Sequence, residues 1–335
     1  MVTPTVLEEQ CEWRGPEVGE SYVWSLTNEE QSELVAALEH AEAHTSTTLE
    51  ITRGDFPLPH LSVKFEAVAR ELIEGRGVAL IKGVPIHSLG AERASAVYWG
   101  IGRHLGRPWP QNHKGHLLGD VTDQGKTGAD PTSRGNEIGG VAFPFHSDGS
   151  DLVGLFCLNA GASGGASLVA NAVTIHNELV RTEPEMIAAL YDEFAYDFRG
   201  EERSGARPWY LMPLFTERAG RLFVRYIRPY ILSAHRHADA PVPSEMAAAA
   251  MDRVDAMCAD STFHLSMRME PGDMQFVNNY HVLHARAAYT DDPKAGSVRH
   301  LKRLWLETSV LTDDDKPEAF RMGGTTKDWW QAASQ

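Results

Sequence analysis

The second half of the chain is a succession of short apolar segments divided by glycine- and proline-containing turns, and this pattern restricts the fold more than any other feature. Each segment has the length and the residue types of a strand. Turns such as Ser163-Gly164-Gly165 and Pro271-Gly272 separate them. Many short strands of this kind predict a sandwich or a jelly roll. The predicted strands cover residues 153–158, 167–170, 222–227, 263–270, 273–278 and 298–307.

Helices are predicted before this region and within it. The first group covers about 27–43, 61–74 and 92–105, with a buried strand at 78–81, and the second covers 175–182, 184–193 and 244–258. Residues 115–140 are rich in Gly, Asp, Thr and Ser and predict a long loop. We therefore expect an α+β fold in a single catalytic domain over 1–335. It would have an α/β N-terminal part (about 1–110) and a jelly-roll core (about 140–310) that contains a helical insertion (about 175–260).

Charge and cysteine content restrict the partners. The chain has 46 acidic and 31 basic residues, a formal net charge of −15, which disfavours nucleic acid and anionic membranes. Its three cysteines lack any CxxC spacing, so a disulfide framework or a zinc ribbon is not expected. No segment approaches the ~20 apolar residues of a membrane span. We expect a cytoplasmic protein with a small-molecule partner, and a homodimer is compatible with such a chain.

A histidine and an aspartate two residues apart, His146 and Asp148, form the first candidate site. In a strand, residues i and i+2 point to the same side, so the two side chains would project together. The third ligand would be His284, 138 residues later (284 minus 146), with His281 as its competitor. Two histidines and one carboxylate on one face of an octahedral ion leave three open positions, as in Fe(II) oxygenases. Taken alone, the pair also fits a hydrogen-bonded surface contact.

A strand over 298–306 would place Arg299, Leu301, Arg303 and Trp305 on one face. Burying an unpaired guanidinium is costly. An anionic ligand would offset that cost through a bidentate pair, and so would an internal salt bridge to a glutamate. Spacing alone leaves both interpretations open.

Taken together, these segments resemble the taurine dioxygenase/TfdA-like group of Fe(II)/2-oxoglutarate oxygenases, which includes clavaminate synthase-like enzymes. The matching motifs are FHSD at 145–148, SGGAS at 163–167, NNxxxLHxR at 278–286 and RHLKRLWL at 299–306. They occur in the order found in the family, and the resemblance covers about residues 78–307. It implies a double-stranded β-helix (jelly roll) core with flanking helices.

The resemblance also implies roles for single residues. His146, Asp148 and His284 would bind iron, and Arg299 would hold the C5 carboxylate of 2-oxoglutarate. Ser167 would contact the other end of this co-substrate, at a position where relatives often have Thr. The spacing of 15 residues from His284 to Arg299 (299 minus 284) leaves Arg303 as the alternative carboxylate ligand.

The resemblance implies an Fe(II)/2-oxoglutarate-dependent dioxygenase that uses O2 and releases succinate and CO2. The substrate would be a small molecule oxidised at a C–H bond, an amino acid or another small carboxylate. Asp148 favours hydroxylation over halogenation, because related halogenases lose this carboxylate to make room for chloride. Desaturation or oxidative cyclisation is the first alternative. A zinc hydrolase or a sensor with a jelly-roll fold is the second, and Arg299 argues against it.

Three segments supply candidate substrate contacts. The loop with Gln111 and Asn112 precedes the metal strand, where ordinary loop polarity is the alternative. Asn279 would support the metal ligands through hydrogen bonds. The segment 225–230 is rich in Arg and Tyr, and an ion pair at a sheet edge is its alternative explanation. Its candidate residues are Arg225, Tyr226 and Arg228.

Overall fold

The computed structural model describes residues 3–8, 10–128, 130, 133–135, 137–202 and 204–321. Two sheets face each other at its centre, in the order β1-β2-β14-β6-β17-β3 (with β4 paired to β17) and β13-β8-β15-β5. Every pairing within them is antiparallel except β1 with β2. The predicted jelly roll is confirmed.

The strands of the larger sheet are β1 (Val23–Ser25), β2 (Val78–Lys82), β3 (Arg107–Pro108), β4 (Leu118–Val121), β6 (Leu152–Asn159), β14 (Met274–Asn278) and β17 (His300–Glu307). Those of the smaller sheet are β5 (Phe143–His146), β8 (Ser167–Asn171), β13 (His264–Met267) and β15 (Val282–Arg286). A two-stranded ladder joins β7 (Ser163–Gly164) to β16 (Tyr289–Thr290). The predicted loop at 115–140 therefore contains one strand, β4, that pairs with β17.

The larger sheet is buried on both faces, which explains why β2 is a continuous apolar run. Along β2, Val78 and Leu80 pack in the cluster between the sheets, and Ala79 and Ile81 pack in the cluster under the helices. Alternation of side chains along the strand divides them in this way. Each such aliphatic side chain contributes about 1.5–3 kcal/mol by its burial.

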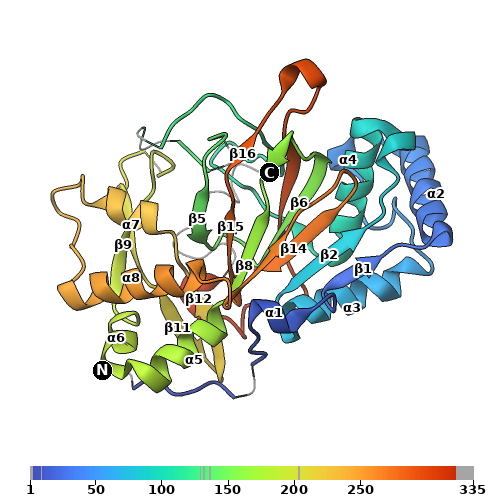
Figure 1. The fold of residues 1–335 in the computed structure, drawn as a ribbon. Coiled ribbons are helices and arrows are strands. Elements are labelled where there is room, and N and C mark those ends of the chain that lie inside the picture. Colours follow the sequence, from blue (N-terminus) through green and yellow to red (C-terminus); the bar gives the residue numbers. More distant parts are fainter. Residues whose placement is uncertain are drawn as a thin grey trace.

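The N-terminal helices cover the outer face of the larger sheet, on the right of Figure 1. They are α2 (Asn28–His44), α3 (Leu61–Glu74) and α4 (Ile86–Leu105), whereas the short helix α1 (Gly15–Val18) contacts β13 of the smaller sheet. Thr27 caps α2 by accepting a hydrogen bond from the Glu30 amide, and the Glu30 side chain accepts one from the Thr27 amide. α4 begins six residues earlier than predicted, because it continues across a kink at Gly90 (φ 76°), a conformation that glycine permits.

The insertion lies on the opposite side of the sheets, on the left of Figure 1. It contains strands as well as helices, which corrects the prediction of a helical insertion. The predicted helix 184–193 ends at Ala189, and residues from Glu193 onward form a hairpin. Its elements are α5 (Ala172–Thr182), α6 (Pro184–Ala189), β9 (Glu193–Asp197), β10 (Trp209–Pro213), β11 (Phe215–Arg218), β12 (Arg221–Val224), α7 (Arg228–Ala234) and α8 (Glu245–Ala259).

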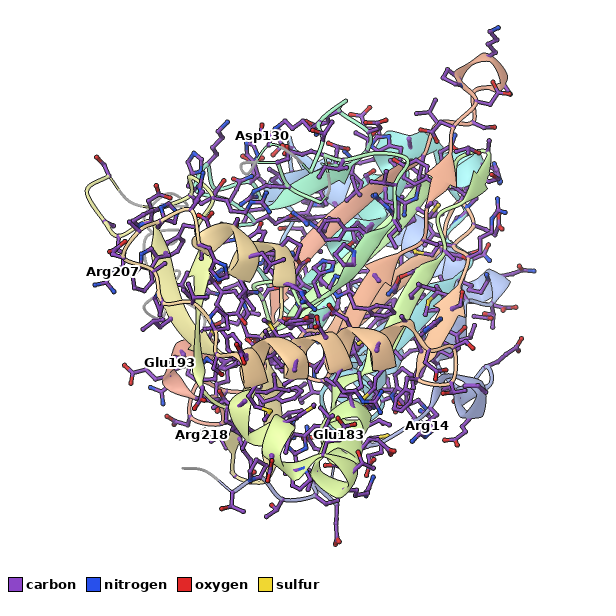
Figure 2. All side chains as sticks on the ribbon, turned by 60° about the vertical axis from the view of Figure 1, so that its left-hand side comes forward. Arg14, Asp130, Glu183, Glu193, Arg207 and Arg218 are labelled. Carbon is purple, nitrogen blue, oxygen red and sulfur yellow. The ribbon has the colours of Figure 1, made fainter. Side chains whose placement is uncertain are left out.

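Charged side chains such as Glu193, Arg207 and Arg218 project from the periphery of the insertion in Figure 2 and are exposed. Its interior packs on the main hydrophobic core through residues such as Phe215 and Met251. Among the described residues, no helix combines the length and the apolar composition that crossing a membrane requires.

A buried ion pair fastens the segment that follows β17. Lys316 and Asp151 have side chains that are 1% and 0% exposed, and their charged atoms lie 2.8 Å apart. The Asp151 carboxylate also accepts hydrogen bonds from the Thr308 amide and the Tyr280 hydroxyl. Tyr280 in turn donates to the backbone carbonyl of Phe320. The pair therefore holds residues 308–321 against the jelly roll.

Replacing Lys316 by Met should destabilise the fold by about 3–5 kcal/mol, because the Asp151 carboxylate would stay buried without its cation. Urea unfolding measures this loss. Lys126→Met is the control: it removes the partner of Glu137 in a more exposed pair (Lys126 42% exposed), and about 0–1 kcal/mol is expected. Equal losses in the two variants would contradict a special role for the buried pair.

Candidate metal centre and its cavity

A cavity opens between the two sheets, the insertion and the segment after β17. It encloses about 1540 Å³ of empty space, its open mouth included. The smaller sheet contributes His146 and His284, the region of β17 contributes Arg299 and Arg303, and the segment after β17 contributes Phe320. Its wall combines many apolar side chains with a few charged and polar ones, as the walls of small-molecule sites do.

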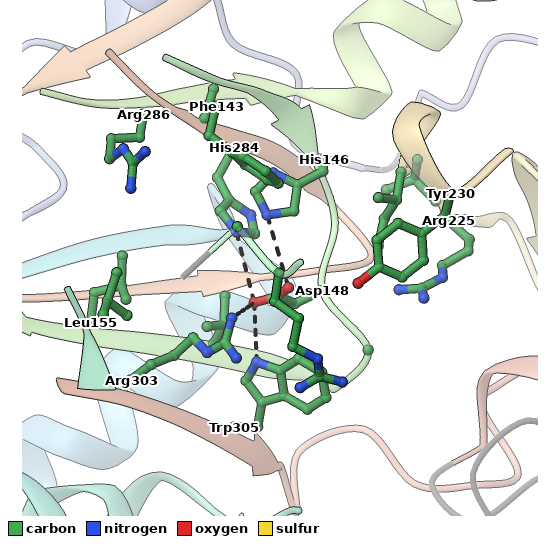
Figure 3. A pocket seen from close by; sticks show the side chains of 18 of the residues that line it. Phe143, His146, Asp148, Leu155, Arg225, Tyr230, His284, Arg286, Arg303 and Trp305 are labelled. Carbon is green, nitrogen blue, oxygen red and sulfur yellow. Dashed lines mark hydrogen bonds and ion pairs between the residues drawn. The ribbon is translucent and has the colours of Figure 1, made fainter. Parts of the chain in front are cut away.

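Three side chains that could hold a metal ion meet in this cavity. His146 is the last residue of β5 and pairs directly with His284 of β15, with ring centroids 4.2 Å apart. Asp148 follows β5, and its two carboxylate oxygens each lie 3.9 Å from one histidine Nε2 atom. The donor atoms of the three residues all lie within 4.8 Å of one another. Figure 3 shows the two rings side by side above the carboxylate.

Hydrogen bonding selects the ring nitrogen that His146 offers to a metal. Its Nδ1 atom lies 2.9 Å from the Pro144 carbonyl oxygen, which can only accept, so Nδ1 carries the proton and Nε2 is free to bind. Pro144 is tolerated because β5 is an edge strand and its nitrogen need not donate to a neighbour.

The three side chains have the protonation states that metal binding requires. Burial lowers the pKa of His284, with repulsion from His146, to about 3. Burial also lowers the pKa of His146, against the opposing attraction of Asp148. For Asp148, burial alone would raise the pKa, but the charges of Arg303 and the histidines lower it to about 2. Near neutral pH the site therefore offers two neutral imidazoles and one carboxylate, the donor set of a facial triad.

Two neighbours fix the orientation of Asp148. The Trp305 indole Nε1 donates to Oδ2 of this carboxylate at 3.0 Å. The Asn279 side-chain oxygen accepts from the Asp148 backbone amide at 2.9 Å, and its nitrogen donates to the Ser150 carbonyl. Asn279 therefore holds the backbone of Asp148 in place through its side chain. Outer contacts of this kind orient ligands and raise metal affinity.

Arg299 is an unpaired cation in the wall of the cavity. The residue is 6% exposed, and its Nη1 atom has no hydrogen-bond partner. Its guanidinium lies over the Tyr289 ring at 5.1 Å, and no carboxylate of the described residues forms a salt bridge with it. Burial, together with Arg286, lowers its pKa to about 10, so it stays charged near neutral pH. The internal salt bridge that the sequence left open is not found among the described residues.

The turn before β8 leaves room for this guanidinium. Gly165 has φ of 70°, and a Cβ atom there would lie 3.0 Å from the Arg299 Nε atom. A larger residue at 165 would therefore press on the arginine as well as strain the backbone. Ser167, two residues on, is buried and lines the same cavity.

Arg303 lies next to the group formed by His146, Asp148 and His284, which is called the metal group below. Asp148 is the one carboxylate with which Arg303 forms an ion pair among the described residues. Its Nη1 atom is 3.9 Å from Asp148 Oδ2, and its Nε atom donates to the Gln111 side-chain oxygen at 2.7 Å. Gln111 is 2% exposed and also donates to the backbone carbonyls of Arg303 and Leu117. Gln111 therefore holds Arg303 in place and does not line the cavity, which corrects its predicted role as a substrate contact.

Three other predicted residues also lie away from the cavity wall. The Tyr226 hydroxyl donates to Asp255, and Arg228 pairs with Asp252 and Asp255 of α8. Asn112 stabilises an exposed turn through its contacts with Lys114 and His116. Arg225, by contrast, lines the cavity as predicted.

His281, the competing metal ligand, points elsewhere. Its Nε2 atom is 2.9 Å from the Cys11 carbonyl oxygen, so this histidine ties the N-terminal segment to β15. It does not belong to the metal-binding group. His281 lies in the turn before β15, outside the strand that carries His284.

Sequence reasoning missed several lining residues, among them Arg286, Tyr210 and Tyr230. Arg286 follows His284 by two residues in the same strand. Side chains at i and i+2 point to the same face, so this spacing could have predicted that Arg286 faces the cavity with His284. Tyr210 lies in the unpredicted hairpin, and no local pattern identified it.

The family model described as "Taurine catabolism dioxygenase TauD, TfdA family" matches residues 37–305. FR-33289 synthase of Streptomyces rubellomurinus is 32% identical over 300 residues, covering 88% of each chain. The taurine hydroxylase-like protein SAT17 of Stachybotrys chartarum is 28% identical over 326 residues, covering 92% of this chain and 80% of the other.

Solved structures share the fold at low sequence identity. An asparagine oxygenase in complex with Fe(II), 3-hydroxyasparagine and succinate has a TM-score of 0.68 and 17% identity, covering 88% of this chain and 98% of the other. The non-heme iron oxygenase OrfP in complex with Fe and α-ketoglutaric acid has a TM-score of 0.61 and 18% identity, covering 86% and 94%.

Replacing Trp305 by Phe should lower metal affinity by roughly 10–100-fold, because the indole N–H that orients Asp148 is lost. Anaerobic calorimetric titration with Fe(II) measures this change. Trp109→Phe makes the same substitution elsewhere in the core cluster between the sheets and should leave metal affinity unchanged. Unchanged affinity in the Trp305 variant would show that Asp148 needs no such support.

Proposed function

This chain belongs to the TauD/TfdA dioxygenase family, and from that premise we propose that it oxidises a C–H bond of an amino acid or another small carboxylate. It is an Fe(II)- and 2-oxoglutarate-dependent dioxygenase that uses O2. The amino acids associated with its structural neighbours support the finer proposal, because one neighbour is an asparagine oxygenase and another was solved with hydroxyarginine.

We assign iron binding to His146, Asp148 and His284. The support is the convergence of their donor atoms and their protonation states. Three protein ligands on one face suit a metal that must also bind a bidentate 2-oxo acid and O2, whereas a structural zinc site closes its coordination with four.

The unpaired, buried guanidinium of Arg299 is the observation that carries the proposal. It lies in the same cavity as the metal group and has no anionic partner among the described residues. The distal carboxylate of 2-oxoglutarate would supply that partner through a bidentate pair. Ser167 lines the cavity close by and would donate its hydroxyl to the co-substrate.

Arg303 is a less suitable partner for the distal carboxylate of 2-oxoglutarate, because it already donates a hydrogen bond to Gln111 and lies near Asp148. Its charge there would attract the carboxylate end of 2-oxoglutarate that lies toward the metal. We therefore assign Arg299 to the distal carboxylate and Arg303 to the region of the metal.

When bound, Fe(II) with 2-oxoglutarate and O2 supplies an oxidant able to break an unactivated C–H bond, and the co-substrate leaves as succinate and CO2. The chain's own residues position the substrate and exclude water. Apolar and aromatic side chains make up much of the wall, including Val153, Leu155, Phe143, Tyr280 and Phe320. An apolar wall of this kind would exclude water and hold the target carbon of the substrate in one orientation.

Anaerobic addition of Fe(II) and then 2-oxoglutarate tests the assignment of the metal ligands. The wild type should develop a weak visible charge-transfer band that needs both additions. His284→Ala and His146→Ala should abolish iron binding and the band. His281→Gln is the control and should retain the band, because His281 contacts the Cys11 carbonyl instead. Loss of iron from the His281 variant would overturn the assignment.

Arg299→Met should raise the 2-oxoglutarate concentration needed for half-saturation by roughly tenfold to hundredfold, because a charge-assisted pair contributes about 1.5–3 kcal/mol. The same band, titrated with 2-oxoglutarate, measures the change. Fe(II) affinity should stay near that of the wild type. A large effect in Arg303→Met with none in Arg299→Met would transfer the role to Arg303.

A further inference from the structure

Arg225 places a second unpaired guanidinium in the cavity, contributed by the insertion. Its Nη2 atom donates to the Tyr210 hydroxyl at 2.9 Å, and its Nη1 atom donates to the Ser147 carbonyl at 3.3 Å. Both acceptors are neutral, and no carboxylate of the described residues forms a salt bridge with it. A cation in this setting is stabilised by an anion brought by a ligand.

Two hydroxyl groups adjoin this guanidinium. Tyr210 accepts from Arg225, so its own proton remains available for donation. Tyr230 lines the cavity, and its hydroxyl has no hydrogen bond within the described part of the chain. Figure 3 shows the Tyr230 ring next to Arg225, with its hydroxyl oxygen directed toward the side where Asp148 lies. Together the three side chains offer N–H and O–H donors to one oxyanion.

Ser147 fixes the position of these donors relative to the metal. It lies between His146 and Asp148 and is 0% exposed. Its amide donates to the Tyr226 carbonyl at 2.8 Å, and its hydroxyl accepts from the Tyr226 amide at 3.1 Å. With the Arg225 contact, three hydrogen bonds join this one residue to the segment 225–226. A group held by Arg225 is therefore held at a defined place with respect to the metal.

In Figure 3, Arg225 lies on the side of the metal group opposite to Arg303 and Arg286. The co-substrate assigned to the region of Arg299 and Arg303 would leave Arg225 without an anion. Two separate anions therefore fit the cavity, one for each side of the metal group.

The remaining acids of the cavity wall are already neutralised. Asp197 accepts two hydrogen bonds from the Arg236 guanidinium, and Glu201 pairs with Arg134 at 3.2 Å. Asp148 belongs to the metal group. No carboxylate among the described lining residues is left to receive a substrate ammonium group.

The net charge of the cavity wall also disfavours a substrate that carries an ammonium group. Arg225, Arg286 and Arg299 form no salt bridge within the described part of the chain. Arg303 has only the 3.9 Å contact with Asp148. Fe(II) and dianionic 2-oxoglutarate cancel each other, so the excess of positive charge persists in the loaded enzyme. This field favours an anionic substrate over a zwitterion.

We propose that Arg225, Tyr210 and Tyr230 bind an oxyanion at one end of the substrate, and that this substrate has no free ammonium group. The inference rests on the proposed function and revises its substrate class. Free amino acids are excluded, and small oxyanions other than carboxylates are admitted, provided that any amine they carry is acylated or otherwise neutral. Carboxylate, sulfonate and phosphonate groups share the chemistry that these donors recognise.

A matched panel of probes tests the proposal. It contains β-alanine, taurine and 2-aminoethylphosphonate, each as the free amine and as the N-acetyl derivative. Calorimetric titration of the enzyme with Fe(II) and 2-oxoglutarate, under anaerobic conditions, gives the affinities. At least one N-acetyl derivative should bind tenfold or more tightly than its free amine. The ranking of the three head groups identifies which oxyanion the site prefers.

Variants show whether Arg225 is responsible. Arg225→Met should weaken binding of the preferred probe by roughly tenfold to hundredfold. Tyr210→Phe, which removes one donor and keeps the arginine, should weaken it several-fold. Arg228→Met is the matched control, because Arg228 lies three residues away and pairs with α8 outside the cavity. It should bind the probe as the wild type does.

The charge-transfer band with Fe(II) and 2-oxoglutarate separates this inference from the proposed function. Its presence in the wild type and in all three variants shows that the metal and co-substrate sites are intact. Its absence from the wild type would refute the proposed function, while the calorimetric comparison would still decide the anion site. Equal probe affinity in the wild type, Arg225→Met and Tyr210→Phe, or tighter binding of the free amines, would overturn the inference.

Discussion

The chemistry of the cavity depends on the pairing of β5 with β15, because this ladder sets His146 opposite His284. Side chains alternate along a strand, so a slip of one residue would turn His284 away from the cavity. Val282 packs in the cluster between the sheets, whereas Leu283 packs in the cluster on the other face of β15. Hydrophobic burial on both faces therefore fixes the register, and the metal-binding geometry follows from that packing.

This scaffold holds an unusual amount of unpaired charge. Buried guanidinium groups such as Arg299 and Arg225 cost free energy in the unliganded protein, since no carboxylate neutralises them. The buried charges of Lys316 and Asp151, by contrast, are paired within the protein. Anions of bound ligands would offset this cost, as proposed for the co-substrate and the substrate. The protein accepts a loss of stability at the site where it gains affinity.

Local patterns in the sequence predicted much of the fold and identified His146 and Asp148 as neighbours in a candidate metal site. The cap at Thr27 located the start of α2, and the spacing of His146 and Asp148 predicted their shared direction, because both depend on neighbouring residues alone. The β9–β10 hairpin and the roles of Arg225 and Arg228 depended on distant partners. These two arginines look alike in the sequence, and only the acids of α8 distinguish them.

The residues of the cavity come from two parts of the chain, the jelly roll and the insertion, which are joined by hydrogen bonds at Ser147. The jelly roll supplies the metal group and Arg299, and the insertion supplies Arg225, Tyr210 and Tyr230. Because three hydrogen bonds join Ser147 to residues 225–226, the two parts are held in one relative position at this point. A change of the Arg225 side chain removes one of these three bonds, and the two bonds made by the Tyr226 backbone remain. Function lies in the site, and the fold determines where that site can vary.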